Sequence, residues 1–180
     1  YVGLFSDITE IKENQRQLEH LAYHDSLTQL PNRSLLADRM QMALAQAKRN
    51  GTLAAVAYLD LDGFKPVNDT HGHHVGDLVI KDFYNRTGQM LRIPDILARF
   101  GGEEFCMIVP GLTLEEAAGY FEALREAISQ LQVETNGQRF GMTISIGVSS
   151  PQSGSSDLHA MRSEADRRLY ISKASGRNRV

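Results

Sequence analysis

The chain contains 180 residues with a formal net charge of -3, and 42% of its residues are hydrophobic. This length suits one domain with a short appendage and is sufficient to bury a sizeable core. The slightly acidic balance, without a lysine- or arginine-rich run, excludes a sequence-independent nucleic-acid binder, because such proteins neutralise phosphate charge with clustered basic residues. The basic residues should therefore serve local sites.

The sequence shows neither an apolar run of the roughly 20 residues needed to span a membrane nor the pattern of a signal peptide. Its one cysteine, Cys106, lies in an apolar stretch typical of a buried strand, so we interpret it as a small core residue rather than a reactive thiol. A single free cysteine is compatible with a reducing compartment. We expect a fragment that is cytoplasmic and is not itself in the membrane.

The first 23 residues differ from the rest of the chain. Residues 1–6 have the pattern of a strand end without a partner, and Asp7-Ile8-Thr9 offers an N-cap for a polar helix that runs to about Tyr23. A heptad-like stripe, typical of a short parallel coiled coil, is formed by Ile8, Ile11, Gln15, Leu18 and Ala22. The alternative is a helix packed on its own domain. We favour a linker over 1–23, made of this strand end and the helix, that places two copies of a domain over 24–180 side by side.

Hydrophobic periodicity and turn residues predict the elements of this second part. In chain order they are a helix over 34–49 capped by Ser34 and stopped by Gly51, a strand over 52–59, a loop over 63–75, a helix over 76–90, a hairpin over 96–109, a helix over 113–131, a strand over 143–148, a loop over 151–156 and a helix over 157–174. This order implies an α+β fold of the ferredoxin-like or palm type, with a mostly antiparallel central sheet and flanking helices.

The hairpin has an unusual tip. Two adjacent glycines, Gly101 and Gly102, precede two adjacent carboxylates, Glu103 and Glu104, between two apolar strand-like runs. Glycine accepts a positive φ and has no side chain, so a bulky anion can lie against such a turn. Taken alone, an ordinary surface hairpin with solvated glutamates is the commoner explanation of this pattern.

A second carboxylate position strengthens the case for a site. Asp60 ends the predicted buried strand, where a desolvated charge is costly unless a cation or hydrogen-bond donors compensate it. In a palm-like sheet this strand end lies beside the hairpin turn, so Asp60, Glu103 and Glu104 should converge. Carboxylates beside a backbone that tolerates close phosphate approach suit Mg²⁺-dependent phosphoryl or nucleotidyl transfer.

Further polar residues suit a nucleotide. Lys65, Lys173 and Arg177 are candidates to hold the remaining anionic oxygens. Asn68 and Asp77 are candidates to read a base, because a carboxylate accepts hydrogen bonds from the N1–H and N2–H₂ groups of guanine. The residues alone therefore indicate a metal-dependent nucleotide enzyme.

Three loop histidines, His71, His73 and His74, raise the question of zinc. They lack the i, i+4 spacing of a helical zinc site and have no cysteine partner nearby. We interpret them as solvated or secondary residues of the loop.

The stretch Gly101-Gly102-Glu103-Glu104-Phe105 resembles the signature of the GGDEF domains, the diguanylate cyclases. The resemblance extends from about His24 to the end of the chain. Its other blocks are residues 24–28 and 32–33, 60–65, 68–69, 72–77, 165–170 with 173, and 176–178. The segment Asp7-Ile8-Thr9 and the following helix are similar to the junction by which a PAS sensor domain joins a cyclase.

This resemblance implies that two GTP molecules condense into cyclic di-GMP with release of two pyrophosphates. Each subunit of a homodimer would hold one GTP, and each 3′-hydroxyl would attack the opposing α-phosphate. The resemblance assigns Mg²⁺ or Mn²⁺ to Asp60, the main-chain carbonyl of Leu61, Glu103 and Glu104. It also assigns activation of the 3′-hydroxyl to Glu103.

By the same resemblance, Asn68 and Asp77 read guanine, and Lys65, Lys173 and Arg177 hold the triphosphate. The full set of implied substrate contacts is Phe64, Lys65, Asn68, His73, Asp77, Gly101, Gly102, Lys173 and Arg177. We interpret Asp62 as a structural residue that caps the turn after the strand.

Arg92 and Asp95 form an Arg-x-x-Asp pattern upstream of the hairpin that resembles the family's inhibitory product site. The alternative is a surface ion pair of little energetic consequence. We suggest Arg125 as the second arginine of that site. The competing function is a silent receptor that binds GTP or cyclic di-GMP without turnover, and a template-directed polymerase palm is disfavoured by the acidic charge and small size.

Overall fold

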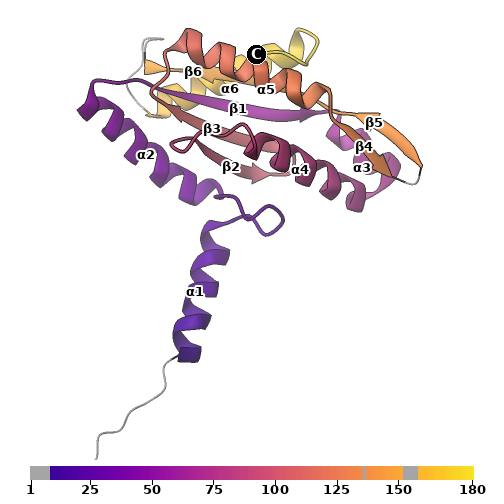
Figure 1. Ribbon diagram of the computed structural model, residues 1–180, viewed down its shortest axis with the longest axis horizontal. Helices are drawn as coiled ribbons and strands as arrows, with labels where there is room; N and C mark the ends of the chain where they lie inside the picture. The colour runs from indigo at the N-terminus through magenta and orange to yellow at the C-terminus, as the bar shows by residue number, and fades with distance from the viewer. Residues whose placement is uncertain (1–8, 136, 152–157) are drawn as a thin grey trace, which may run out of the picture.

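A computed structural model describes residues 9–135, 137–151 and 158–180 (Figure 1). Helix α1 (Thr9–Tyr23) precedes the folded body and has no buried residue. Ile11 and Leu18 of the heptad-like stripe are 63% and 68% exposed, so the rest of the described chain does not cover this stripe. Ile8, the predicted cap and the predicted strand end lie outside the described residues. None of the helices in the described ranges is both long and apolar enough to cross a membrane.

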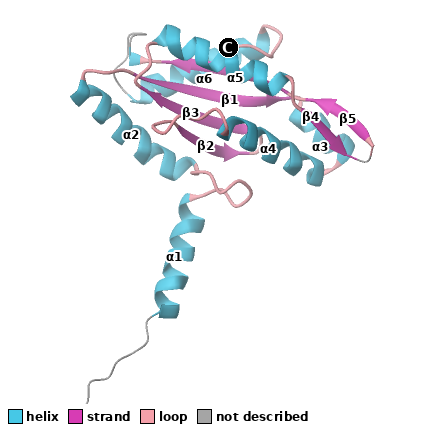
Figure 2. Ribbon diagram, in the orientation of Figure 1, coloured by secondary structure: helices cyan, strands magenta, loops and turns pink. Residues whose placement is uncertain are grey.

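The body is built on a four-stranded antiparallel sheet (Figure 2). Its strands are β1 (Ala54–Asp62), β2 (Ile96–Gly101), β3 (Glu104–Pro110) and β6 (Thr143–Ser149), in the order β2-β3-β1-β6. This order, with a crossover helix before and after the β2–β3 hairpin, is that of a ferredoxin-like fold. The predicted fold class is therefore confirmed.

Helices cover both faces of the sheet. Successive side chains of a strand point to opposite faces, and in these strands the side chains on both faces are apolar. One face packs on α4 (His73–Gly88) and α5 (Leu114–Ser129), and its core includes Leu59, Phe83, Phe105 and Phe121. The other face packs on α2 (Arg33–Asn50) and α6 (Leu158–Ala174), and its core includes Met40, Cys106 and Met161. The interpretation of Cys106 as a buried core residue is confirmed, and burial raises the pKa of its thiol.

Three local predictions need correction. Asn32, not Ser34, caps α2, because its side chain accepts hydrogen bonds from the backbone N–H groups of Ser34 and Leu35. The expected loop after β1 contains helix α3 (Phe64–His71), in which Pro66 occupies the first turn, where no backbone N–H is needed. The short hairpin of β4 (Gln132–Thr135) and β5 (Gln138–Gly141) was not anticipated.

Other boundary signals are confirmed. Gly51 ends α2 in the left-handed conformation, with φ 64°. Thr113 and Glu116 form the predicted capping box at the start of α5. The predicted loop over 151–156 lies almost wholly outside the described residues.

Helix α6 approaches the sheet closely at Gly147 of β6. A Cβ atom at this position would lie 2.1 Å from the carbonyl oxygen of Ala165 and 2.2 Å from the backbone nitrogen of Leu169. Only a residue without a side chain allows this contact. The contact determines how far the C-terminal end of α6, with Lys173, lies from the end of β1.

We predict that Gly147→Ala lowers the free energy of unfolding by about 1–3 kcal/mol, because α6 must move away from the sheet. Urea unfolding followed by circular dichroism measures the change. Gly119→Ala on the exposed face of α5 is the matched control, since nothing lies within 4 Å of its added Cβ. The control should be neutral or stabilising by roughly 0.5–1 kcal/mol. Equal stability of the two variants would contradict the close approach at Gly147.

Candidate active site

A cavity of about 460 Å³ lies where β1 ends beside the β2–β3 turn, and we call it the β1-end cavity. It brings together seven of the residues that the sequence singled out. They are Asp60, Leu61, Phe64, Lys65, Glu103, Lys173 and Arg177. Residues from the strand, from α3, from the hairpin and from the end of α6 therefore meet in one place, although up to 117 positions separate them in the chain.

Asp60 is the buried charge of this cavity, with 6% of its surface exposed. Lys173 of α6 lies with its Nζ atom 2.6 Å from Oδ2 of Asp60. Burial raises the pKa of Asp60, the ammonium group of Lys173 opposes the rise, and the charges of Glu103 and Glu104 add to it. The cavity thus concentrates negative charge at a point where one cation already lies.

The hairpin turn is fastened to the body by Arg99. This guanidinium donates from Nε and Nη2 to the carbonyl oxygen of Gly102, at 3.1 and 2.8 Å, and from Nη1 to Oδ1 of Asp25, at 2.9 Å. Gly101 and Gly102 have φ values of 140° and 52°, which residues with a side chain rarely adopt. The predicted glycine turn is therefore present and is held from inside the fold by a residue that the sequence analysis did not select.

The two glutamates of the turn line different cavities. Asp60 faces Glu104 in the antiparallel register of β1 and β3, and the backbone N–H of Leu61 donates to the carbonyl of Glu103 at 3.2 Å. Glu103 lines the β1-end cavity. Glu104 lines a second cavity between α2 and α6, on the face of the sheet that Tyr58 also borders. The predicted convergence of the three carboxylates agrees with this arrangement, since Glu104 is paired with Asp60 across the strands and the charges of both glutamates raise the pKa of Asp60. Glu103 and Glu104 nevertheless line different cavities.

The predicted base-reading residues lie outside the lining of the β1-end cavity, on α3 and α4. Asn68 packs against the backbone of α4, since a Cβ on Gly76 would lie 2.0 Å from its Oδ1 atom. This buried Oδ1 atom has no hydrogen-bond partner among the described residues. Asp77 follows Gly76 directly and is exposed, as is His73 at the start of α4. Asn68 and Asp77 are thus neighbours.

Asp62 is structural, as predicted, but it does not cap the turn. Its carboxylate accepts hydrogen bonds from the Thr143 and Ser145 hydroxyls of β6 and from the backbone N–H of Asn178. It therefore ties the C-terminal tail, which carries Arg177, to the sheet.

The Arg-x-x-Asp residues form a tight local pair. Nη2 of Arg92 lies 2.6 Å from Oδ1 of Asp95, a carboxylate whose side chain is fully buried. Tyr120 of α5 donates from its hydroxyl to Oδ2 of Asp95 at 3.1 Å, and its ring lies below the Arg92 guanidinium. Arg125, suggested as a second arginine, pairs with Glu122 and donates to Asn178. Its role at the inhibitory site remains a prediction.

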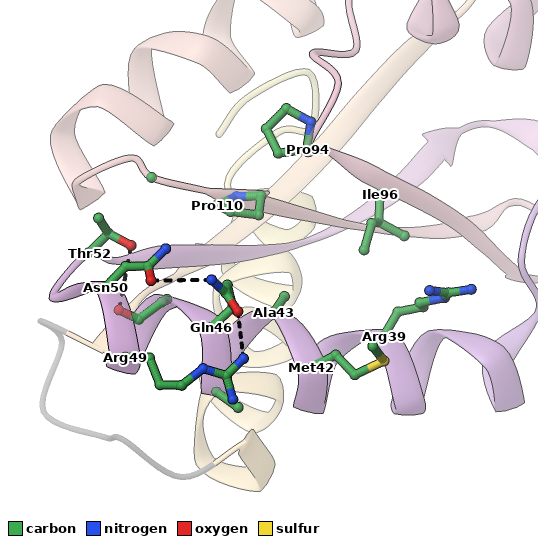
Figure 3. Close-up of a pocket in the computed structure, with 13 residues that line it drawn as sticks. Arg39, Met42, Ala43, Gln46, Arg49, Asn50, Thr52, Pro94, Ile96 and Pro110 are labelled. Carbon is green, nitrogen blue, oxygen red and sulfur yellow. Dashed lines mark hydrogen bonds between the residues drawn. The ribbon is translucent and has the colours of Figure 1, made fainter.

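A larger cavity, of about 720 Å³, lies between α2 and the Pro94 and Pro110 ends of β2 and β3 (Figure 3). Its lining residues include no carboxylate, and its charged groups are those of Arg39 and Arg49. It therefore has the character of an apolar groove beside the Arg-x-x-Asp pair and offers no group for metal-dependent chemistry.

The donors of the β1-end cavity fit a magnesium ion. Within the described ranges, no three His, Cys, Asp or Glu side chains group closely enough to hold a metal by themselves. Mg²⁺ in nucleotide enzymes is usually held by one or two carboxylates together with substrate phosphates and water. Asp60 and Glu103 supply two carboxylates, and the phosphates would supply the remainder.

Comparison with known proteins agrees with this geometry. The model of the family described as "Diguanylate cyclase, GGDEF domain" matches residues 22–179. The chain belongs to the GGDEF family. The fold is that of this family's domain.

Individual relatives support the same assignment. The bifunctional diguanylate cyclase/cyclic di-GMP phosphodiesterase MucR of Pseudomonas aeruginosa is 39% identical over 171 residues, which are 94% of this chain and 25% of MucR. The diguanylate cyclase DgcP of the same organism is 38% identical over 168 residues, 93% of this chain and 24% of DgcP. The chain therefore spans about a quarter of the length of these relatives.

Among solved structures, the coiled coil and GGDEF domain of DgcB from Caulobacter crescentus, in complex with c-di-GMP, superposes with a TM-score of 0.86. The two sequences are 34% identical, and the match covers 96% of this chain and 92% of that one. Because the covered part includes α1, the helix preceding the domain also has a counterpart in that structure.

The Asp25–Arg99 ion pair predicts that the stability of the fold depends on pH. Burial alone would raise the pKa of Asp25, but hydrogen bonds from Thr28 and Arg99 outweigh it and lower the pKa below its usual value. The charged form therefore stabilises the fold above the unfolded pKa of about 3.9, and this contribution is lost as the pH falls through the folded pKa. We expect Asp25→Asn to cost about 1 kcal/mol at neutral pH and progressively less as the pH falls below the unfolded pKa of about 3.9.

Urea unfolding between about pH 3 and pH 7 measures the difference in unfolding free energy between wild type and variant, which should shrink toward acid pH. Asp38→Asn is the control, because Asp38 is an exposed carboxylate on α2 without a hydrogen bond or ion pair to any described residue. A difference between Asp25→Asn and wild type that stays constant with pH would show that the charge of Asp25 contributes nothing.

Proposed function

We propose that this chain is an active diguanylate cyclase domain that condenses two GTP molecules into cyclic di-GMP and two pyrophosphates. The observation that carries the proposal is the β1-end cavity, in which Asp60 and Glu103 lie together with Lys65, Lys173 and Arg177. Two carboxylates with three cations suit a metal-bound triphosphate.

The residues of the β1-end cavity and of the glycine turn have different roles in the proposed reaction. Lys65, Lys173 and Arg177 bind the β- and γ-phosphates and stabilise the charge of the departing pyrophosphate. The turn at Gly101 and Gly102 admits the α-phosphate against the backbone. The 3′-oxygen of one GTP forms a bond to the α-phosphorus of the other, the bond from that phosphorus to the bridging oxygen breaks, and pyrophosphate leaves with the electron pair. Glu103 accepts the proton of the 3′-hydroxyl.

Asp60, Glu103, Glu104 and the main-chain carbonyl of Leu61 would hold a magnesium or manganese ion, which would neutralise phosphate charge and lower the pKa of the attacking hydroxyl. The short Lys173–Asp60 contact supports this arrangement. Lys173, which balances the charge of Asp60 in this structure, would then also be available to a phosphate oxygen.

We assign guanine recognition to Asn68 of α3 and Asp77 of α4. Asp77 presents an exposed carboxylate, and the neighbouring Asn68 presents a buried oxygen without a partner among the described residues. Together they offer acceptors for the N1–H and N2–H₂ groups of guanine. His73 at the start of α4 and Phe64 at the start of α3 complete the proposed contacts.

The reaction needs two copies of the chain, each holding one GTP. Helix α1, with Ile11, Leu18 and Leu21 exposed, supplies an apolar stripe for a parallel coiled coil between them. We place the domain boundary near residue 24, between this linker and the cyclase domain. We further propose that the linker follows a PAS-type sensor domain in the parent protein.

We also propose feedback inhibition by cyclic di-GMP at Arg92 and Asp95. DgcB, whose GGDEF domain was solved with c-di-GMP, supports binding of this product by close relatives. In the present structure both oxygens of Asp95 are engaged by Arg92, and Tyr120 donates to one of them. Product binding therefore competes with these intramolecular hydrogen bonds.

Glu103→Gln tests the catalytic assignment. The substitution keeps the shape of the side chain but removes its charge and its capacity to accept a proton. We expect pyrophosphate release from GTP and Mg²⁺ to fall by about two orders of magnitude or more, measured with a coupled phosphate assay. Glu115→Gln, an exposed glutamate in the first turn of α5, is the control. Retained activity in Glu103→Gln would refute the role of this carboxylate.

Arg92→Ala tests the inhibitory site. We expect the affinity for cyclic di-GMP, measured by calorimetry, to fall by about tenfold or more because a charged hydrogen-bond donor is lost. Inhibition of the cyclase should weaken in parallel. Arg139→Ala, which removes an exposed arginine of β5, should change neither quantity. Inhibition that persists unchanged in Arg92→Ala would place the product site elsewhere.

A further inference from the structure

The cavity of about 720 Å³ between α2 and the ends of β2 and β3, which we call the α2 groove, has no part in the proposed reaction (Figure 3). It shares no lining residue with the β1-end cavity, and neither Arg92 nor Asp95 lines it. Its volume lies within the range of small-molecule sites. A ligand in the α2 groove would therefore leave the β1-end cavity open.

The walls of the α2 groove are aliphatic. They come from Met42 and Ala43 on α2 and, facing them, from Pro94, Ile96 and Pro110 (Figure 3). Proline has no backbone N–H group, so two of these residues offer no main-chain donor to a ligand. None of the described residues that line the groove is aromatic, so a nucleotide base would find no ring on which to stack. These walls suit a flexible hydrocarbon chain better than a planar base.

Part of this apolar surface is open to water. Met42 is 56% exposed, and Ile93, next to Pro94, is fully exposed. Removing such surface from water is favourable, so an apolar ligand that covers it gains affinity with each methylene group it buries.

The charged groups of the α2 groove are positive. Among the described residues that line it, Arg39 and Arg49 carry charge and none is a carboxylate. At one end Arg49 donates to Gln46, whose side-chain amide donates in turn to Asn50 (Figure 3). At the other end Arg39 is exposed and makes no hydrogen bond or ion pair with any residue in the described ranges. One guanidinium is thus available, and a guanidinium can bind a carboxylate through two parallel hydrogen bonds.

We infer that the α2 groove binds an amphipathic anion, namely a medium-chain aliphatic carboxylate. Its carboxylate pairs with Arg39, and its hydrocarbon chain lies between Met42 and the two prolines. Arg92 donates to the carbonyl oxygen of Pro110 at 3.1 Å, so the ligand contacts both segments that Arg92 joins. The inference rests on the walls and the charge of this groove and does not depend on the proposed function.

The test titrates sodium decanoate, below the concentration at which it forms micelles, into the full chain. The methyl NMR signals of Met42, Ala43 and Ile96 report occupancy of the α2 groove. Octanoate measures the contribution of the chain, and octan-1-ol is the probe without a carboxylate. We expect saturable binding at one site that shifts these three signals. Each methylene group removed should weaken binding about fourfold, so octanoate should bind about fifteenfold more weakly than decanoate.

Two substitutions at exposed positions of α2 separate the parts of the site, and thermal unfolding verifies that the variants fold. Arg39→Gln should weaken decanoate binding about fivefold and leave octan-1-ol binding unchanged. Met42→Glu places a like charge in the groove and should weaken decanoate binding by about tenfold or more. The matched controls are Gln41→Glu, at an exposed neighbour that does not line the groove, and Arg167→Gln, at an exposed arginine of α6. Both controls should bind decanoate as wild type does.

Several results would overturn the inference. One is the absence of saturable decanoate binding by the wild-type chain, and another is equal binding by wild type, Arg39→Gln and Met42→Glu. A third is decanoate binding that cyclic di-GMP displaces and that Arg92→Ala, but not Arg39→Gln, abolishes, because the ligand would then lie at the Arg-x-x-Asp pair.

A second copy of the chain is the competing occupant of the groove. Sedimentation that shows a dimer of the wild-type chain, lost in Met42→Glu and retained in Gln41→Glu, would assign the groove to that copy and overturn the inference. None of these measurements reads pyrophosphate release. A chain that proves inactive on GTP therefore tests the α2 groove as well as an active one.

Discussion

The antiparallel register between β1 and β3 is the constraint on which the rest of the site depends. With Asp60 opposite Glu104, the two carboxylates point to the α2–α6 face of the sheet, while Leu59 and Phe105 point to the core under α4 and α5. Side chains alternate along a strand, so a slip by one residue would exchange these faces. It would bury Asp60 among apolar side chains without a cation, which is energetically prohibitive. The apolar alternation of β1 and β3 therefore also positions the chemistry.

Helix α6 completes the site because it can lie almost on the sheet. Its contact with Gly147 brings Lys173 within 2.6 Å of Asp60, and Asp62 holds the following tail through the backbone of Asn178. A buried carboxylate without such a partner would favour its neutral form. The same arrangement that stabilises Asp60 in the free domain thus places two cations, on Lys173 and Arg177, beside the proposed position of the triphosphate.

Sequence reasoning succeeded where the signal was local. The alternation of β6, the apolar run of β1 and the glycine turn predicted the ferredoxin-like sheet, and seven predicted residues share one cavity. It missed α3, because Pro66 and flanking polar residues have a loop-like composition although proline fits a first helical turn. It also missed partners that only the fold brings together, such as Arg99 with Asp25, 74 positions apart, and Tyr120 with Asp95. The charge of Arg99 within an apolar strand was the one available signal for the first of these. Nothing local distinguishes Glu103 from Glu104, since the separation of their cavities depends on the packing of α2 and α6.

The central proposal is that this domain joins two guanine nucleotides through two phosphodiester bonds and releases two pyrophosphates. Incubation of the wild-type chain with GTP and Mg²⁺, followed by mass spectrometry of the nucleotide products and quantification of pyrophosphate, measures it most directly. The account predicts one cyclic dinucleotide and two pyrophosphates for every two GTP consumed. Unchanged GTP under conditions where the folded domain binds it, or a product with a single phosphodiester bond, would contradict the account.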